Sequence, residues 1–428
     1  MDVFMGVQMP KVWLLLLNKT MKTNLLVLLR RMDTSECLFY LRFPREDCDA
    51  LLAQGIEDSF VVEAGVPVDW DKLHDWLTQK EDWVLGWIGY DVRRSIERFG
   101  KEKLRASAFP QIALIRPTNL FKIRGAEVEV IKGTWHASLN TWLSMQPAEV
   151  AKGVELKPVV SHAEYLEHIA ALKRHIAVGN VYELNYCMPF EARVHLTDAP
   201  SVWKHIYHQT KAPFSAYAQV GAHHVMCASP ERYLKREGNR VISQPIKGTV
   251  RRGQTPEEDT RLKDQLGSSR KERAENVMIV DLVRNDLSRC AERDSVQVEE
   301  LFGVHSFKTV HHLVSTIRCD VAPETSWVDL IKATFPMGSM TGAPKLSAMQ
   351  LIAQHEETER GIYSGSIGYI EPGGDFDFNV VIRSVQYDAA SQLASCHVGG
   401  AITALCEAED EYNECLLKAE AVLRALRG

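Results

Sequence analysis

The run FSAYAQVGAHHVMCAS, from Phe214 to Ser229, is two short β-prone segments with Gly221 between them. Short strands joined by a tight turn are typical of an antiparallel hairpin. Further β-rich runs lie on both sides of it, at residues 181–194 and 240–246. This part of the chain therefore predicts an antiparallel sheet and not a series of alternating β-α-β units.

Three helices are predicted around these strands. The segment 161–180 opens with Ser161 and Glu164 in the spacing of a capping box, carries an apolar stripe at a period of 3.6, and ends near Gly179. A second helix is predicted from Ser269, again with a glutamate three residues later, and a third over 409–426. The predicted fold class is α+β, with antiparallel β-sheets flanked by helices.

The chain divides into two predicted regions. Residues 1–150 form an N-terminal β-rich region, a polar join follows, and residues 160–428 form the main domain. The first 20–30 residues are either disordered or precede the natural start. Their longest apolar run, Val12 to Leu17, is far too short to cross a bilayer, so we predict no targeting segment and no membrane association.

Composition excludes several classes of protein. The chain has 428 residues, a formal net charge of -6 and 45% hydrophobic residues, which is ordinary for a globular protein and gives no basis for binding nucleic acid. Its nine cysteines are odd in number and form no CxxC pair. This pattern predicts reduced thiols and a cytoplasmic location.

Lys247 is the first candidate for chemistry. It lies in SQPIKGTVRRG, residues 243–253, between Ile246 and Gly248. Such a lysine is either an ordinary residue at the end of a surface strand or an amine nucleophile held in a pocket. Glu231 precedes it by 16 residues across a turn, which suits neighbouring strands that share a pocket; a surface salt bridge is the alternative.

Two predicted helices each carry a Glu-x-x-Glu motif, Glu272/Glu275 and Glu411/Glu414. Residues three apart share one helix face, so each pair is either a solvated face or half of an oxygen cage. Carboxylates together with water and a substrate anion are typical ligands of Mg²⁺. His-rich or thiolate metal sites are not supported by the sequence.

Other polar positions interrupt apolar runs. Arg383 lies in a predicted strand, FDFNVVIRSVQY at residues 376–387, which is apolar on both sides of it; Arg383 is either outward-facing or a clamp for a carboxylate. The paired Gly399 and Gly400 end a predicted strand and could bind an anion through backbone N–H groups, or form an ordinary turn. The run PMGSMTGAPKLSAMQLI, 336–352, lacks the spacing of a nucleotide-binding P-loop.

Taken together, these runs resemble the chorismate-utilising enzymes, which include the anthranilate, aminodeoxychorismate, isochorismate and salicylate synthases. The matching runs occur in the family's order over about residues 160–428. They are SPERYL, QPIKGT, RAENVMIVDLVRND, HHLVST, GSMTGAPK, RGIYSG, FNVVIRS, VGGAIT and EDEYNECLLKAE. The N-terminal GWIGYDV resembles, more weakly, the first domain of the anthranilate and aminodeoxychorismate members.

The resemblance implies antiparallel sheets flanked by helices and a Mg²⁺-dependent site for chorismate. It implies that Glu275 and Glu414 bind the metal and that Glu272 and Glu411 support it through water. It also implies that His312 lines the ring of the substrate. The residues implied to contact the substrate carboxylates are Gly248, Thr249, Tyr363, Arg383, Gly400 and Lys418.

The sequence around Lys247 separates the branches of this family. Anthranilate synthases resemble PIAGT here, whereas PIKGT is typical of the aminodeoxychorismate branch, in which the lysine is the nucleophile. Isochorismate and salicylate formers carry a water-activating lysine at the position of Glu183. The resemblance therefore implies conversion of chorismate and ammonia to 4-amino-4-deoxychorismate for 4-aminobenzoate and folate, with Glu231 protonating the departing hydroxyl.

Two expectations follow from this implied reaction. Lys247 must be neutral when it attacks, so desolvation and nearby cationic groups should depress its pKa. No cysteine lies in a Gly-x-Cys-x-Gly elbow, so ammonia should come from a separate glutamine amidotransferase. Anthranilate synthase component I is the alternative enzyme, and a chorismate-sensing binding protein is the non-catalytic alternative.

Overall fold

The hairpin predicted from Phe214–Ser229 forms the centre of one sheet. In the computed structural model, which describes residues 37–100, 102, 104–136 and 154–427, β10 (Phe214–Val220) pairs antiparallel with β11 (His223–Ser229). Every strand-to-strand pairing in these residues is antiparallel, so the predicted α+β class is confirmed. The first 36 residues and most of the predicted polar join, at 137–153, lie outside the described residues.

Two large sheets contain the strands. The eleven-stranded sheet runs in the order β17 (Gly342–Ala343), β9 (Glu183–Arg193), β21 (Leu393–Ile402), β20 (Ser384–Asp388), β11, β10, β1 (Cys37–Arg42), β2 (Ala50–Gln54), β6 (Asn119–Arg124) and β7 (Glu127–Lys132), with β8 (Lys157–Pro158) beside β9. The ten-stranded sheet runs β14 (Ile246–Arg251), β16 (Val310–Asp320), β13 (Arg240–Gln244), β12 (Arg232–Glu237), β19 (Phe376–Asn379), β18 (Ser366–Ile370), β4 (Val84–Ile88), β5 (Ile112–Arg116) and β3 (Asp58–Val62), with β15 (Gln297–Ser306) beside β16.

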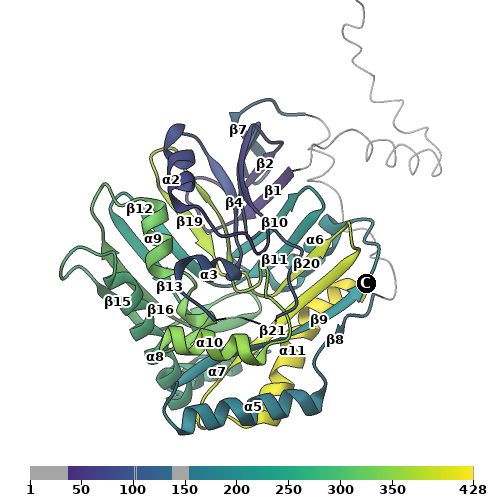
Figure 1. The fold of residues 1–428 in the computed structure, drawn as a ribbon, viewed down its shortest axis with the longest axis vertical. Helices are drawn as coiled ribbons and strands as arrows, with labels where there is room; N and C mark the ends of the chain where they lie inside the picture. The colour runs from purple at the N-terminus through teal and green to yellow at the C-terminus, as the bar shows by residue number, and fades with distance from the viewer. Residues whose placement is uncertain (1–36, 101, 103, 137–153, 428) are drawn as a thin grey trace, which may run out of the picture.

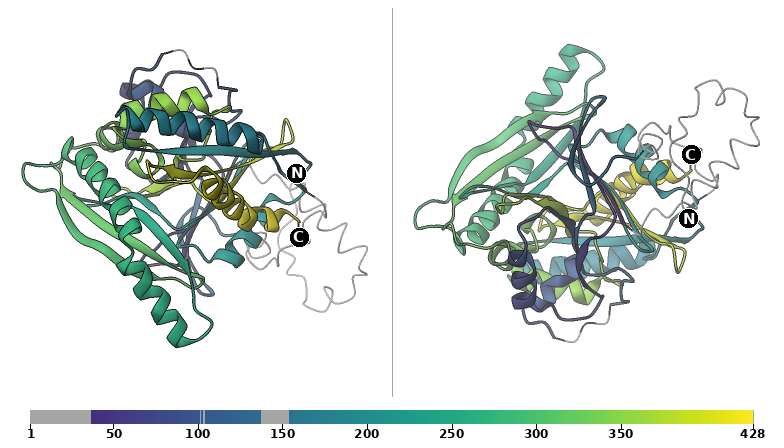
Figure 2. Two further views of the ribbon diagram at one scale, coloured as in Figure 1. Left: turned by 90° about the horizontal axis from the view of Figure 1, so that it is seen from below. Right: turned by 90° about the horizontal axis from the view of Figure 1, so that it is seen from above.

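Helices cover the outer faces of the two sheets. Figure 1 shows α5 (His162–Ala177), α7 (Pro256–Ser268), α8 (Arg270–Ser288), α10 (Lys345–His355) and α11 (Ala408–Arg427) along the lower side of the molecule. Figure 2, seen from below, shows the yellow α11 between the dark teal α5 and the green α7 and α8. The remaining helices are α2 (Trp70–Gln79), α3 (Arg93–Ile96), α6 (Ala199–Thr210) and α9 (Trp327–Thr334), with 3₁₀ turns at Tyr90–Val92 and Gly338–Met340.

The core lies between and beside the sheets. One buried apolar cluster combines Phe39 and Val225 of the eleven-stranded sheet with Trp87 and Ala113 of the ten-stranded sheet, so the two sheets pack face to face there. A second cluster lies under α5, α6 and α11, and a third joins the ten-stranded sheet to α8 and α9. Burial of these apolar faces is the main force that holds the layers together.

Strands from the N-terminal region complete both sheets. β1, β2, β6 and β7 extend one sheet, and β3, β4 and β5 extend the other. The predicted boundary near residues 150–160 falls partly outside the described residues and stays a prediction. The strands before and after it share the same hydrogen-bonded sheets.

Helix α5 follows its sequence signals closely. Its capping box is present, with the Glu164 backbone N–H donating to Ser161 Oγ at 3.3 Å and the Ser161 N–H donating to Glu164 Oε2 at 2.9 Å. At α8 only half of the predicted box forms: the Glu272 N–H donates to Ser269 Oγ, while the Ser269 N–H donates to the carbonyl of Leu266. The Glu272 carboxylate is thereby directed elsewhere.

One predicted strand is wrong. The run FDFNVVIRSVQY, 376–387, was expected to be continuous, but it divides into β19 in the ten-stranded sheet and β20 in the eleven-stranded sheet. Between them Arg383 adopts φ +51°, in the left-handed region, so Arg383 lies in a bend and not within a strand. The chain crosses here from one sheet to the other.

Candidate active site

Lys247 lies near the start of β14, where the strand is irregular. The pairing of β14 with β16 shifts register between Ile246 and Thr249, and Gly248 adopts φ +94°. The Lys247 Nζ lies 3.3 Å from Glu183 Oε1 and 3.5 Å from Glu275 Oε2, and its side chain is 21% exposed. A partly buried ammonium is thus held between two carboxylates from distant segments.

These carboxylates correct the prediction for the Lys247 pKa. Burial lowers the pKa of this ammonium, but attraction to Glu183 and Glu275 outweighs burial, and the pKa is raised above its ordinary value. The expected depression is therefore wrong for this arrangement. The physical reason is that the groups nearest to the amine are anions, whereas the prediction assumed cations.

Glu231 is the second predicted catalytic residue, and the β12–β13 hairpin brings it close to Lys247. Arg232 pairs with Gln244, which places Glu231 opposite the Pro245–Ile246 turn into β14. The Glu231 side chain is buried, and burial raises its pKa to about 7, although the charges of Lys247 and Arg383 partly offset the effect. A carboxyl with such a pKa is a suitable general acid near neutral pH.

Arg383 and His312 complete this group. Burial lowers the pKa of Arg383, and the charge of Glu231 partly opposes that effect. Burial and the positive charge of Arg383 lower the pKa of His312 to about 3, so His312 is neutral. Its Nδ1 lies 2.7 Å from Thr249 Oγ1, across the β14–β16 pairing. Among the described residues, Arg383 forms no salt bridge. Its guanidinium is therefore suited to bind an incoming carboxylate.

The two Glu-x-x-Glu motifs lie at the N-terminal ends of α8 and α11. One glutamate of each motif lies beside a glycine that was predicted to contact the substrate. A Cβ added at Gly248 would lie 2.8 Å from Glu272 Oε2, and a Cβ added at Gly400 would lie 2.6 Å from Glu411 Oε2. Burial and then the charge of Glu275 raise the pKa of Glu272. The four carboxylates therefore gather around the backbone of β14 and β21.

Within this cluster, Glu414 has a cationic partner that lowers its pKa, whereas the pKa of Glu411 is raised. Burial and repulsion from Glu414 raise the pKa of Glu411 to about 7. Burial also acts on Glu414, but Lys418, whose Nζ is 2.7 Å from Glu414 Oε1, lowers the Glu414 pKa overall. Lys418 also donates to the carbonyl of Gly399 at 2.7 Å. The cluster would be stabilised by a further cation.

A divalent cation fits this cluster by its donor chemistry. Within the part of the chain that the structure describes, no three side chains are already placed as ligands of one metal ion. However, carboxylate oxygens are the ligands that Mg²⁺ prefers, and burial, together with repulsion among the carboxylates, raises the pKa values of Glu272 and Glu411. The chemistry of these donors therefore fits Mg²⁺.

Tyr363 is less closely connected to the group than was expected. Its ring stacks on His397 with centroids 5.3 Å apart, and Cys187 Sγ lies 3.8 Å from its hydroxyl oxygen. Both contacts lie in the buried interior. Electrostatic interactions thus link Glu231 with Lys247 and Arg383 and Arg383 with His312, Thr249 joins the group by its hydrogen bond to His312, and the predicted contact of Tyr363 with the substrate stays a prediction.

Glu183 belongs to the site but was not among the predicted site residues. Its position was recognised only as the one where water-using relatives carry lysine, yet its carboxylate is the nearest anion to Lys247. A glutamate that opens an apolar strand, ELNYCMPF, was the available signal. Its pairing with Lys247 joins residues 64 apart in the sequence and follows only from the tertiary fold.

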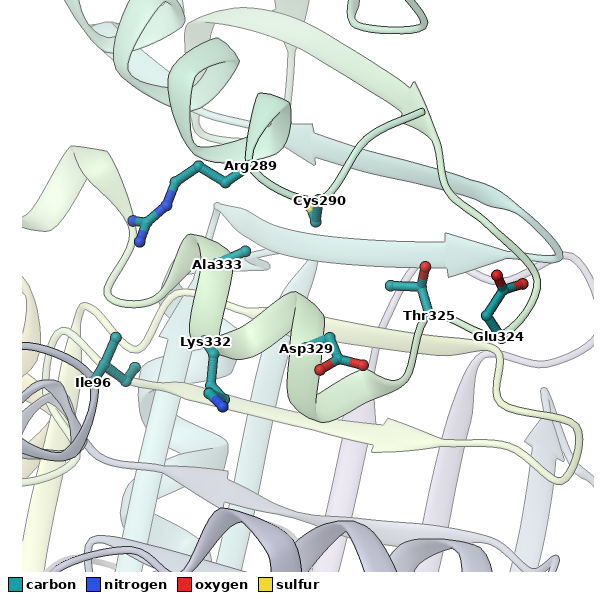
Figure 3. Close-up of a pocket in the computed structure, with 8 residues that line it drawn as sticks. All are labelled: Ile96, Arg289, Cys290, Glu324, Thr325, Asp329, Lys332 and Ala333. Carbon is teal, nitrogen blue, oxygen red and sulfur yellow. The ribbon is translucent and has the colours of Figure 1, made fainter. Parts of the chain in front are cut away.

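A separate cavity lies away from this group. It measures about 580 Å³ and is lined from α3, α9 and the end of α8 (Figure 3). A second cavity, of about 180 Å³, is mostly apolar and includes Pro230, Ile246 and Val314. Neither is lined by Lys247, Glu231, Arg383 or the glutamate pairs, so the predicted site is defined by its charged groups.

The fold and this group of charged residues define the class of protein. Residues 45–424 match the chorismate binding enzyme family, and the chain belongs to that family. It is 34% identical to aminodeoxychorismate synthase component 1 of Klebsiella aerogenes, over 80% of this chain and 77% of that protein. It is 44% identical to the probable chloroplastic aminodeoxychorismate synthase of Oryza sativa, over 61% of this chain.

The matched part spans only 29% of the length of that rice relative. Among solved structures, anthranilate synthase component I from Streptococcus pneumoniae is similar with a TM-score of 0.75 and 26% identity, covering 87% of this chain and 92% of that one. These comparisons confirm the predicted family. In the described residues, no helix is long and apolar enough to cross a membrane.

Proposed function

We propose that the chain is the synthase component of an aminodeoxychorismate synthase, which converts chorismate and ammonia to 4-amino-4-deoxychorismate for 4-aminobenzoate and folate synthesis. The observation that carries the proposal is that Lys247, on the irregular strand β14, interacts electrostatically with the buried acid Glu231, which directly precedes β12. An amine nucleophile beside a carboxyl with a pKa of about 7 suits substitution of a hydroxyl group. The names of the relatives support the same reaction.

The proposed chemistry uses two residues of the chain. Lys247 gives up a proton to solvent and its Nζ bonds to C2 of chorismate; the two ring double bonds shift, and the bond from C4 to the hydroxyl breaks as Glu231 donates a proton, so that water leaves. Ammonia then bonds to C4 while the bond between C2 and Nζ breaks. The new nitrogen gives up a proton, which restores Glu231 to its acid form.

Other residues of the group would bind the substrate carboxylates. The Arg383 guanidinium is positioned by a left-handed bend between the two sheets and has Glu231 nearby. Thr249 and neutral His312 hydrogen-bond to each other beside it. The backbones of Gly248 and Gly400 would bind a substrate carboxylate beside Glu272 and Glu411, and Lys418 adds positive charge at the other edge.

We further propose that Glu275 and Glu414 hold Mg²⁺ and that Glu272 and Glu411 support it through water. When bound, the ion would neutralise these glutamates and a carboxylate of the dianionic substrate. The gathering of four carboxylates around β14 and β21 supports this proposed Mg²⁺ site. Every covalent step remains assigned to Lys247 and Glu231.

Ammonia is proposed to come from a separate glutamine amidotransferase. The sequence carries no cysteine in a glutaminase elbow, and the Klebsiella aerogenes relative is named as component 1. Glutamine should therefore replace ammonium only when an amidotransferase is added. Turnover of glutamine by the purified chain alone would overturn this part of the proposal.

Product analysis tests the proposed function directly. The purified chain, chorismate, Mg²⁺ and ammonium should yield 4-amino-4-deoxychorismate, identified by chromatography and mass spectrometry. Anthranilate as the main product would instead support the second enzyme, anthranilate synthase component I, to which the Streptococcus pneumoniae structure belongs. Tight binding of chorismate without turnover would support a chorismate sensor.

A further inference from the structure

Glu183 is a buried carboxylate for which the proposed chemistry has no role so far. It opens β9, only 3% of its surface is exposed, and its Oε1 lies 3.3 Å from Lys247 Nζ. Its other oxygen, Oε2, is buried and has no hydrogen-bond partner among the described residues. One carboxylate oxygen thus faces the amine and the other is unsatisfied.

This arrangement is costly for folding. A buried carboxylate with a single contact to an amine recovers only part of its lost hydration, so the net contribution of such a buried pair to stability is small. Burial accordingly raises the pKa of Glu183, although Lys247 acts in the opposite direction. Stability alone therefore gives no reason for a glutamate at this position.

The backbone around Glu183 is held firmly. Its partner in the sheet is Ala343 of β17, the Tyr182 N–H donates to the Ala343 carbonyl at 2.7 Å, and the Asn185 N–H donates to the Thr341 carbonyl at 2.8 Å. The Asn185 side chain also donates to the Ser339 carbonyl at 3.1 Å. The carboxylate therefore extends toward Lys247 from a fixed point.

Glu275, the other carboxylate near Lys247, also lies near a second lysine, unlike Glu183. Its Oε2 lies 3.5 Å from Lys247 Nζ and its Oε1 lies 4.0 Å from Lys271 Nζ. It is also one of the proposed ligands of Mg²⁺. A carboxylate engaged by a metal ion has less capacity to orient an amine, which leaves Glu183 as the dedicated partner of Lys247.

We propose that Glu183 is the positioning residue for Lys247. Its carboxylate fixes the direction of the amine so that Nζ meets the reacting carbon of the substrate, and it acts through Lys247 without touching the substrate. This inference rests on the proposed function, because it assigns Glu183 a part in the attack by Lys247. A misplacement of about 1 Å in such an attack can reduce its rate about 100-fold.

The test measures formation of the covalent adduct at Lys247 in single turnover, with chorismate and Mg²⁺ but without ammonia, by intact-protein mass spectrometry. Glu183→Leu should slow adduct formation by about 100-fold, and Glu183→Gln, which keeps an oxygen acceptor, by about 10-fold. Equilibrium affinity for chorismate should change by less than about threefold. The thermal midpoint checks that each variant is folded; Glu275, whose Oε2 lies 3.5 Å from Lys247 Nζ, should still compensate part of the ammonium charge.

The matched control is Glu191→Gln. Glu191 lies on the same strand, β9, but its ion pair is with Arg105, away from Lys247. This variant should form the adduct at the wild-type rate. If Glu183→Leu also forms it at that rate while remaining folded, the positioning role is wrong. If the wild type forms no adduct at Lys247, the nucleophile in the proposed function is wrong, and the role of Glu183 falls with it.

Discussion

The side chain of Glu272 lies against the space that a side chain at Gly248 would occupy. A Cβ placed on Gly248 would lie 2.8 Å from Glu272 Oε2 and 3.2 Å from Leu266 Cδ1. The strand turn that carries Lys247 and the helix end that carries the first carboxylate pair are therefore fitted to each other. A substitution at Gly248 should therefore displace the side chain of Glu272.

Gly248→Ala should reduce both stability and activity. Gly248 has φ +94°, which an alanine adopts at a cost of about 1–2 kcal/mol, and the added methyl group would displace Glu272. The free energy of unfolding from denaturant titration measures the first effect. Gly238→Ala is the control, since Gly238 also has positive φ, +59°, but no atom lies within 4 Å of its added Cβ. Equal activity in the two variants would contradict the proposed contact.

Removal of divalent cations should abolish turnover of chorismate. Glu275→Gln and Glu414→Gln should each reduce activity by about 100-fold or more, whereas Glu272→Gln should cost roughly tenfold, because it is proposed to act through water. Activity measured as Mg²⁺ is titrated into chelated protein gives the apparent affinity of each variant. Glu409→Gln, an exposed change on the same helix as Glu414, is the control. Full activity in metal-free buffer would remove the case for the ion.

The elements that local sequence signals specify were predicted correctly. The hairpin at Phe214–Ser229 and the capped helix from Ser161 depend on turn residues, alternation and apolar spacing within about twenty residues. Arg383 shows the limit of this approach. Its β-prone neighbours gave no sign that the chain changes sheets there, because the break depends on which distant strands are available to pair on each side.

The site shows the same division between local and distant information. Motif resemblance located Lys247 and Glu231, and the structure places them together. The raised pKa of Lys247 was not predictable, since it depends on Glu183 and Glu275, which approach from strand β9 and helix α8. An electrostatic property of a side chain follows from its spatial neighbours, and no pattern near Lys247 encodes them.

Glu231→Gln should change how stability depends on pH. The folded-state pKa of Glu231, about 7, lies above the ordinary value for glutamate, so its favourable contribution is complete at low pH and is lost as the pH rises from about 4.5 to 7. The glutamine variant carries no such charge. It should match the wild type near pH 4.5 and exceed its free energy of unfolding by up to about 3 kcal/mol at pH 8.5.

Denaturant titrations at the two pH values measure this difference for Glu231→Gln. The same variant should lower the rate of product formation with little change in chorismate affinity, since a general acid acts mainly in the transition state. A wild-type rate that falls above pH 7 would agree with the need for a protonated Glu231. A stability difference between the two proteins that is the same at both pH values would show that Glu231 does not retain its proton when folded.

Lys247→Ala should abolish the proposed reaction but leave the affinity for chorismate unchanged. The change recreates the PIAGT sequence of the anthranilate synthases and leaves Arg383 and the glutamate pairs in place. Formation of 4-amino-4-deoxychorismate should fall by at least about 1000-fold, as expected when a nucleophile is lost, and residual chemistry should shift toward direct attack of ammonia at C2. Chorismate affinity and product identity measure the two effects, and the wild-type protein with chorismate but no ammonia should show an adduct that maps to Lys247. Near wild-type formation of the 4-amino product by the folded variant would mean that Lys247 only lines the pocket.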